Sequence, residues 1–261
     1  MLHRPDKEGL IVITQPAHAW VSGQLARAWG NETFGDVVPR EEVCVAAELH
    51  DIGFLAWEES PTLNPKTGRP HSFLDLPAEV HFALWSAGIR QMLCYDRYAA
   101  LLVSLHFSGL AQRHPVTHPP GDVRRAKDFL RDQRAFQDTL MTALRNDPQC
   151  SAYSSDEPIG RNRQLVSLWD WMSLLLCMGF SETQVIHDVP TATTKAAISL
   201  TVVSHGLSTR ANVAPWPFQR DSLRLICEGR RLVGTFNDES AMRDALRSAV
   251  PVTMQIELVH G

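Results

Sequence analysis

Residues 40–53 read REEVCVAAELHDIG, and this stretch decides the fold that the sequence predicts. Its apolar residues recur with helical spacing up to Leu49, and Gly53 is typical of the position just past a helix end. The stretch therefore predicts an amphipathic helix that ends at His50 and Asp51. An imidazole and a carboxylate on the inner face of a helix need partners, because an unpaired buried charge is very costly.

The same helical spacing recurs on both sides of this stretch. It predicts helices over residues 16–30, 77–93, 97–110, 122–144 and 165–178. Strand-like runs cover residues 10–14, 197–204, 223–233 and 252–259, with a turn at Glu228-Gly229 and a short helix over residues 240–249. We therefore expect a mainly α protein, in which a helical bundle over residues 1–194 carries a small α+β element over residues 195–261.

Four histidines and two aspartates lie in or beside the predicted helices. They are His18, His50, Asp51, His81, His106 and Asp170. Nitrogen and oxygen ligands that converge inside a helical protein are satisfied better by one or two metal ions than by water and backbone alone. Structural roles are the alternative: His18 as a helix-capping residue, or His81 as a surface residue of its helix.

The remaining histidines fit a metal site less well. His187-Asp188 is a second His-Asp pair, but it runs into Pro190 and has no apolar helix before it, so we interpret it as incidental. His71, His114, His118 and His205 lie in Pro- or Gly-rich contexts and are predicted to be loop residues.

Composition narrows the classes of function. A net charge of -4 and a sequence pI of about 6.2 argue against a protein that holds nucleic acid by attraction to phosphate. The most apolar window, residues 165–180, contains Asp170 and is too short to span a bilayer. Five scattered cysteines without a CxxC motif favour a reduced compartment. We expect a cytoplasmic protein with a small-molecule substrate and no nucleic-acid or membrane partner; its oligomeric state stays open.

The run AAELHDIG (residues 46–53), preceded by His18 and followed by His81, His106 and Asp170, resembles the HD-domain superfamily. These helical metalloenzymes are named for a His-Asp pair at a helix end, and the resemblance covers residues 10–180. More loosely, the whole chain resembles a bacterial family of uncharacterised HD-like proteins. The resemblance assigns a first metal to His18, His50, Asp51 and Asp170, and a second to Asp51, His81 and His106. It implies two Fe or Mn ions, with Zn, Mg, Co or Ni as lesser options.

The commonest reaction of that superfamily is phosphoester hydrolysis. The resemblance thus implies a metal-dependent phosphohydrolase that attacks a small phosphorylated or nucleotide substrate with metal-activated water. The catalytic candidates are Asp51, Lys66, Arg69 and Arg113, with Arg161 or Arg163 as further cations. Phe54 stands where many members carry Lys. A long Pro- and Gly-containing loop, residues 57–75, is expected to cover the site.

Two alternatives stay open. A minority branch of the superfamily, resembling myo-inositol oxygenase and organophosphonate oxygenases, uses the same ligand set for a mixed-valent diiron pair that activates O2. The other alternative is a non-catalytic HD-like module that binds a ligand.

Overall fold

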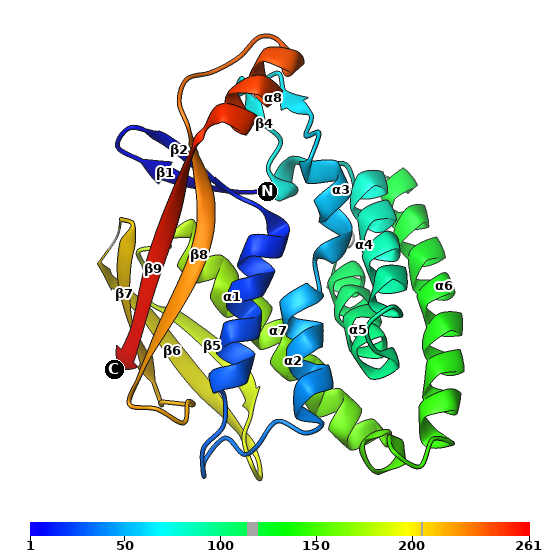
Figure 1. The fold of residues 1–261 in the computed structure, drawn as a ribbon. Coiled ribbons are helices and arrows are strands. Elements are labelled where there is room, and N and C mark those ends of the chain that lie inside the picture. The colour runs from blue at the N-terminus through cyan, green and yellow to red at the C-terminus, as the bar shows by residue number, and fades with distance from the viewer. Residues whose placement is uncertain (114–119, 205) are drawn as a thin grey trace.

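The computed structural model describes residues 1–113, 120–204 and 206–261. It consists of a seven-stranded sheet and a layered group of helices (Figure 1). In the described residues the strand order is β1-β2-β8-β9-β7-β6-β5. These strands are β1 (Leu2–Asp6), β2 (Gly9–Ile13), β5 (Gln184–Pro190), β6 (Lys195–Ser204), β7 (Ser208–Ala214), β8 (Ser222–Leu232) and β9 (Val250–His260). Only the β7–β9 pair is parallel. The protein is α/β, so the expectation of a mainly α fold with a small α+β element is wrong.

The expectation fails because the sheet is assembled from both ends of the chain. β2 pairs with β8, placing Val12 opposite Arg230, more than two hundred positions away. Three strands of this sheet were not expected from the sequence: β1, β5 and β7. The residues of β1 and β5 alternate weakly between apolar and polar, whereas buried residues alternate along β7. β8 also continues through Glu228-Gly229, where a turn was expected. The sheet takes strands from both sides of position 194, and the division there into two domains stays a prediction.

Most helices lie close to the predicted segments, but α7 begins at Asp156 where the prediction began at residue 165, and the short α3 was not expected. They are α1 (Gln15–Ala28), α2 (Arg40–Leu49), α3 (Leu55–Glu58), α4 (Ala78–Met92), α5 (Arg97–Arg113), α6 (Pro120–Arg145), α7 (Asp156–Met178) and α8 (Glu239–Ser248). Three 3-10 turns accompany the helices: η1 (Ile52–Phe54) follows α2, η2 (Phe73–Asp75) lies in the long loop, and η3 (Ser151–Tyr153) precedes α7. The long loop also contains a short hairpin of β3 (Leu63–Asn64) and β4 (Arg69–Pro70). Within the described ranges, no helix combines the length and apolarity needed to cross a membrane. His114, His118 and His205 lie outside the described residues.

The helices α1 and α7 join the helical layers to the sheet (Figure 1). The amide of Gln24 on α1 fastens that helix to β8, because it accepts from Ile226 N at 3.0 Å and donates to Ile226 O at 2.8 Å. α2 and α5 pack on the other side of α1 and α7, and α4 and α6 lie farther out. The sheet therefore supports the two helices that carry His18 and Asp170.

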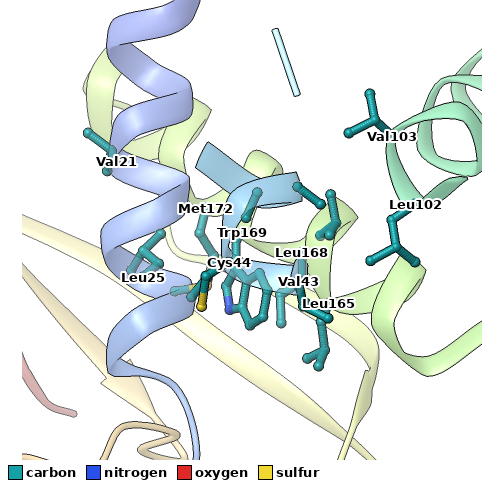
Figure 2. Close-up of a cluster of buried hydrophobic side chains, with 14 of the residues drawn as sticks. Val21, Leu25, Val43, Cys44, Leu102, Val103, Leu165, Leu168, Trp169 and Met172 are labelled. Atoms are coloured by element: carbon teal, nitrogen blue, oxygen red, sulfur yellow. The ribbon is translucent and has the colours of Figure 1, made fainter. Parts of the chain in front are cut away.

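The core fixes how α7 is turned about its axis. Trp169 is fully buried in a cluster that also contains Leu25 of α1, Val43 of α2 and Leu102 of α5 (Figure 2), and its ring meets that of Trp29 edge to face at 5.7 Å. Because consecutive helical side chains diverge by about 100°, a buried Trp169 directs Asp170 to a different side of α7.

Gly53 lets α4 approach the end of the segment that carries His50 and Asp51. A Cβ atom at position 53 would lie 2.2 Å from Leu84 O and 2.6 Å from Gly88 N, both backbone atoms of α4. Only glycine fits this approach without moving α4.

We predict that Gly53→Ala destabilises the protein by about 1–3 kcal/mol, because the added methyl overlaps backbone atoms that have little freedom to move. Gly160→Ala is the matched control: no atom lies within 4 Å of its added Cβ, and alanine in a helix is favoured over glycine by about 0.5–1 kcal/mol. Urea unfolding of both variants measures the difference. Equal midpoints for the two variants would refute the close approach.

Candidate metal centre

Four helices each bring one part of the site to a common point. Thr14 caps α1 by accepting from Ala17 N at 3.1 Å, and His18 lies in the first turn of that helix. His50 follows the last residue of α2, so its side chain leaves the helix with that of Asp51. His106 lies on α5 and Asp170 on α7. All five ligand candidates are buried.

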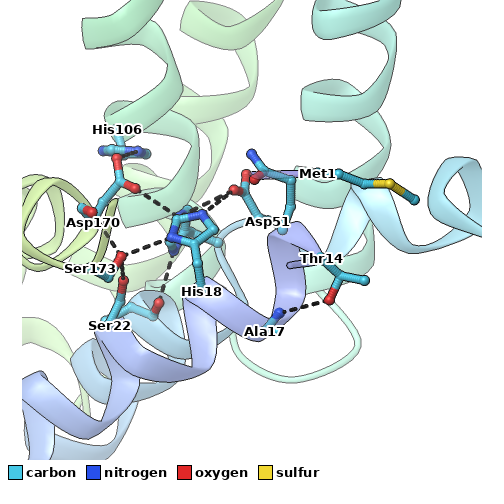
Figure 3. A network of polar contacts seen from close by, with 12 residues as sticks. Met1, Thr14, Ala17, His18, Ser22, Asp51, His106, Asp170 and Ser173 are labelled. Carbon is cyan, nitrogen blue, oxygen red and sulfur yellow. Dashed lines mark hydrogen bonds and ion pairs between the residues drawn. The ribbon is translucent and has the colours of Figure 1, made fainter. Parts of the chain in front are cut away.

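The side chains form a chain of close contacts between imidazole nitrogens and carboxylate oxygens (Figure 3). His18 Nε2 lies 2.8 Å from Asp51 Oδ2. His50 Nε2 lies 3.6 Å from Asp51 Oδ2 and 3.3 Å from Asp170 Oδ1, and His106 Nε2 lies 3.4 Å from Asp170 Oδ2. Two ligands that are each about 2.1 Å from one ion lie roughly 3.0 to 3.4 Å apart, which the His50–Asp170 and His106–Asp170 spacings match.

The sites overlap in one residue. His18, His50 and Asp51 form one group that could hold a metal ion, and His50, His106 and Asp170 form another; within each group the ligand atoms lie within 4.8 Å of one another. His50 belongs to both groups.

Each histidine is oriented through its other ring nitrogen. His50 Nδ1 donates to Ala47 O at 2.8 Å. Ser173 Oγ donates to the carbonyl of Asp170 at 2.8 Å, so it accepts from His18 Nδ1, also at 2.8 Å. This assignment leaves the Nε2 lone pair of a neutral His18 or His50 facing the carboxylates, which is the arrangement of histidines that bind metals.

His106 shares this arrangement, since its Nδ1 lies 2.9 Å from Ser167 Oγ. The Nε2 atoms of His50 and His106 are buried and have no hydrogen-bond partner among the described residues. Buried polar atoms are rarely left in this state. Two such nitrogens beside two carboxylates could hold a cation.

The charges of the site are strongly coupled. Burial alone would lower the pKa of His50, but the Asp51 and Asp170 carboxylates outweigh it and raise that pKa to about 9. Burial alone would raise the pKa of both aspartates, yet the neighbouring imidazoles lower the pKa of Asp51 and hold that of Asp170 well below its usual value. Without a metal, a proton on His50 supplies the positive charge that the two ionised carboxylates require.

His81 is placed differently from the other ligand candidates. Its Nε2 donates to Phe73 O at 2.6 Å, and its ring packs against Phe54 and Trp85. His81 belongs to neither group of potential metal ligands in the described residues. It lines the cavity above them.

A cavity of about 380 Å³ opens onto the ligand candidates. Its walls are mainly apolar and include Phe54, Trp85 and Phe107, while Arg113 is the only Arg or Lys in the described lining. Leu74 and Trp171 line it as well and are 68% and 44% exposed, so they form an apolar rim. The arrangement suits a small molecule with an apolar part.

The other predicted catalytic cations lie elsewhere. Lys66 and Arg69 belong to the β3–β4 hairpin, whose Gly68 O accepts from Phe236 N at 2.7 Å, and neither lines the cavity. Of the long loop, η2 reaches the site through Phe73 and Leu74. The sequence did not reveal that Ala47, Ser167 and Ser173 orient the histidines. One signal was available: Asp170 and Ser173 are one helical turn apart, so their side chains lie on the same face of the helix.

The fold and the site define an α/β protein with a buried His/Asp centre that could hold a metal ion. The chain belongs to the family described as "Protein of unknown function (DUF3891)", whose model matches residues 1–233. No curated protein and no solved structure matches the chain. The resemblance to the HD-domain superfamily is therefore wrong, because the family match is to another family and the large sheet is unlike the helical bundle which that resemblance implied.

We predict that His50→Ala reduces bound metal to well under half of the wild-type content, because His50 belongs to both ligand groups. His81→Ala should keep its metal, since the His81 Nε2 atom donates to Phe73 O. Elemental analysis of the purified variants gives the measurement, and His71→Ala, in the loop after β4, serves as a second control. Equal metal loss in His50→Ala and His81→Ala would place the centre elsewhere.

We predict that metal binding releases about one proton below pH 9, because the ion must displace the proton that the metal-free site holds on His50. The apparent affinity should therefore rise about tenfold per pH unit and level off above about pH 9. Titration calorimetry in buffers of different ionisation enthalpy counts the protons. An affinity independent of pH would show that His50 does not bind the metal.

Proposed function

We propose that the centre holds one divalent metal ion. The candidate ligands, His18, His50, Asp51, His106 and Asp170, form two groups of three that share His50, and the ion takes its protein ligands from one of these groups. Both ligand groups include His50. Its Nδ1 donates to Ala47 O, so only the Nε2 atom, with its single lone pair, is left to bind an ion. A single imidazole nitrogen binds a single ion, so the overlap favours one ion over two. Imidazole nitrogens together with a carboxylate oxygen suit Fe or Mn, with Zn, Mg, Co and Ni as lesser options.

The protein is, on this proposal, a metal-dependent hydrolase of a small phosphorylated molecule. The observation that carries it is the set of three histidines whose Nδ1 atoms are anchored and whose Nε2 atoms face two ionised carboxylates beside a cavity. When bound, an ion of this kind lowers the pKa of a coordinated water and withdraws charge from a phosphoryl oxygen.

The chain's own residues supply position and charge. Asp51 and Asp170 stay ionised at neutral pH, since the pKa of each is lowered. Arg113, in the lining, is placed to bind a phosphoryl oxygen. Trp85 and Phe107, stacked at 4.8 Å, form part of a wall that keeps bulk water from the reacting group.

A second candidate, an O2-dependent oxidation of an apolar substrate, is favoured by the scarcity of cations in this cavity. The described lining contains one arginine among many aromatic and aliphatic side chains. A phosphate ester is usually held by several cations, whereas an apolar substrate needs none.

Anaerobic purification followed by elemental analysis and parallel assays distinguishes the two. We expect about one equivalent of Fe or Mn, and release of phosphate from p-nitrophenyl phosphate or a nucleotide without O2. His50→Ala should lose this activity together with its metal, while Arg124→Gln, on the exposed face of α6, should keep both. If the phosphatase assays give no product and O2 uptake depends on a substrate, the hydrolase proposal is wrong and the oxidation is the function to adopt. Protein without metal would refute both.

A further inference from the structure

A second cavity of about 620 Å³ lies between α5, α7 and β5. It adjoins the metal cavity, because Arg113 and Trp171 line both. Ser167, which contacts the metal-ligand candidate His106, also lies in its wall. The two cavities therefore offer one molecule a continuous path from the metal ligands across the exposed indole of Trp171.

The second cavity is richer in cations than the first. Arg113 and Arg163 both line it, and neither forms an ion pair or a side-chain hydrogen bond within the described part of the chain. Most other arginines near acidic residues are paired, as Arg145 is with Asp156 at 2.7 Å. An oxyanion can accept from two guanidinium groups that line the same cavity.

Gly109 makes room for one of these groups. A Cβ atom at position 109 of α5 would lie 3.3 Å from Arg163 Nη1, so the guanidinium of α7 lies directly over a helix surface that has no side chain. This close placement holds the Arg163 head group against α5 beside Gly109, in the cavity that Arg113 also lines. Arg163 is thus positioned by packing and has no acidic partner among the described residues.

The opposite wall is an irregular part of β5. The pairing of β5 with β6 shifts between Ile186 and Val189, and Asp188 has φ 59°, a left-handed conformation that is uncommon for residues other than glycine. The irregularity places His187 and Asp188 in the cavity wall, and the Asp188 carboxylate lies 3.8 Å from Lys195 Nζ. Such irregularities are concentrated at functional sites.

We propose that this second cavity binds an oxyanion of the substrate, a phosphate or carboxylate that does not react, through Arg113 and Arg163. The substrate then has an apolar part that crosses Trp171 and a reacting group at the metal ligands. This inference rests on the proposed function, because it assigns the far end of the same substrate.

Inorganic phosphate is the probe, titrated into the full-length protein as purified and after treatment with a chelator. We expect the wild type to bind phosphate in both samples, since the oxyanion site needs no metal. Arg163→Gln should weaken binding to the chelator-treated protein by at least about tenfold, because it removes a charged, forked donor. The phosphate affinity of Arg163→Lys should lie between those of the wild type and Arg163→Gln, because lysine keeps the charge but lacks the forked donors of the guanidinium group.

Asp188→Asn gives a change in the opposite direction. Asparagine tolerates the left-handed conformation, and removal of the carboxylate should tighten phosphate binding about threefold. Arg124→Gln makes the same charge change as Arg163→Gln on exposed α6 and should leave phosphate binding unchanged. A loss caused only by misfolding would not give both signs, and all these variants should keep the wild-type metal content.

The outcomes separate this inference from the proposed function. Phosphate binding only to the metal-containing sample, or equal weakening in Arg163→Gln and Arg124→Gln, would overturn the oxyanion site and leave the metal-dependent hydrolase in place. Protein that carries no metal but binds phosphate through Arg163 would overturn the hydrolase and keep the oxyanion site. Absence of phosphate binding from both wild-type samples would overturn the site outright.

Discussion

Two ionised carboxylates, Asp51 and Asp170, lie on either side of one imidazole nitrogen, His50 Nε2, at 3.6 and 3.3 Å inside the protein. Burying two negative charges is unfavourable unless a positive charge joins them. The metal-free protein meets this requirement with a proton, which is why the pKa of His50 is raised to about 9. A divalent ion would meet it more completely, since its charge equals that of the two carboxylates. The first turn of α1, the end of α2 and the inner faces of α5 and α7 supply the groups that meet here.

The sheet contributes to the site by holding α1 and α7 in register. Gln24 joins α1 to β8, and the buried Arg4 of β1 donates to Leu176 O and Cys177 O at the end of α7. A cation that caps the last carbonyls of a helix is favourable both as a hydrogen-bond donor and toward the helix dipole. The two helices that carry His18 and Asp170 are therefore fastened to the same sheet. This explains why a site made of helical residues lies in a protein with seven paired strands.

The sequence predicted local structure well and long-range structure poorly. Helices with strong 3.6-residue periodicity, such as α2 and α5, were found close to their observed limits, because that signal is local. The sheet was underestimated because β1 and β5 have little apolar alternation and are stabilised by partners distant in the chain. For the site, five of six ligand candidates come together, while His81 turns to Phe73 O. A hydrogen bond to a backbone carbonyl leaves no trace in the sequence pattern.

The balance of charge also bears on what the site can bind. A divalent ion beside the two ionised carboxylates would leave the site without net charge, so the site would attract an anionic substrate less strongly than an ion among neutral ligands would. Phe54 lines the metal cavity and adds no cation to it. An anionic substrate must therefore gain its charge-dependent affinity from arginines farther out, and Arg113 stands where the two cavities meet. If the centre holds a metal ion and the second cavity binds an oxyanion, as proposed, their separation favours a substrate that is apolar near its middle and anionic at its far end.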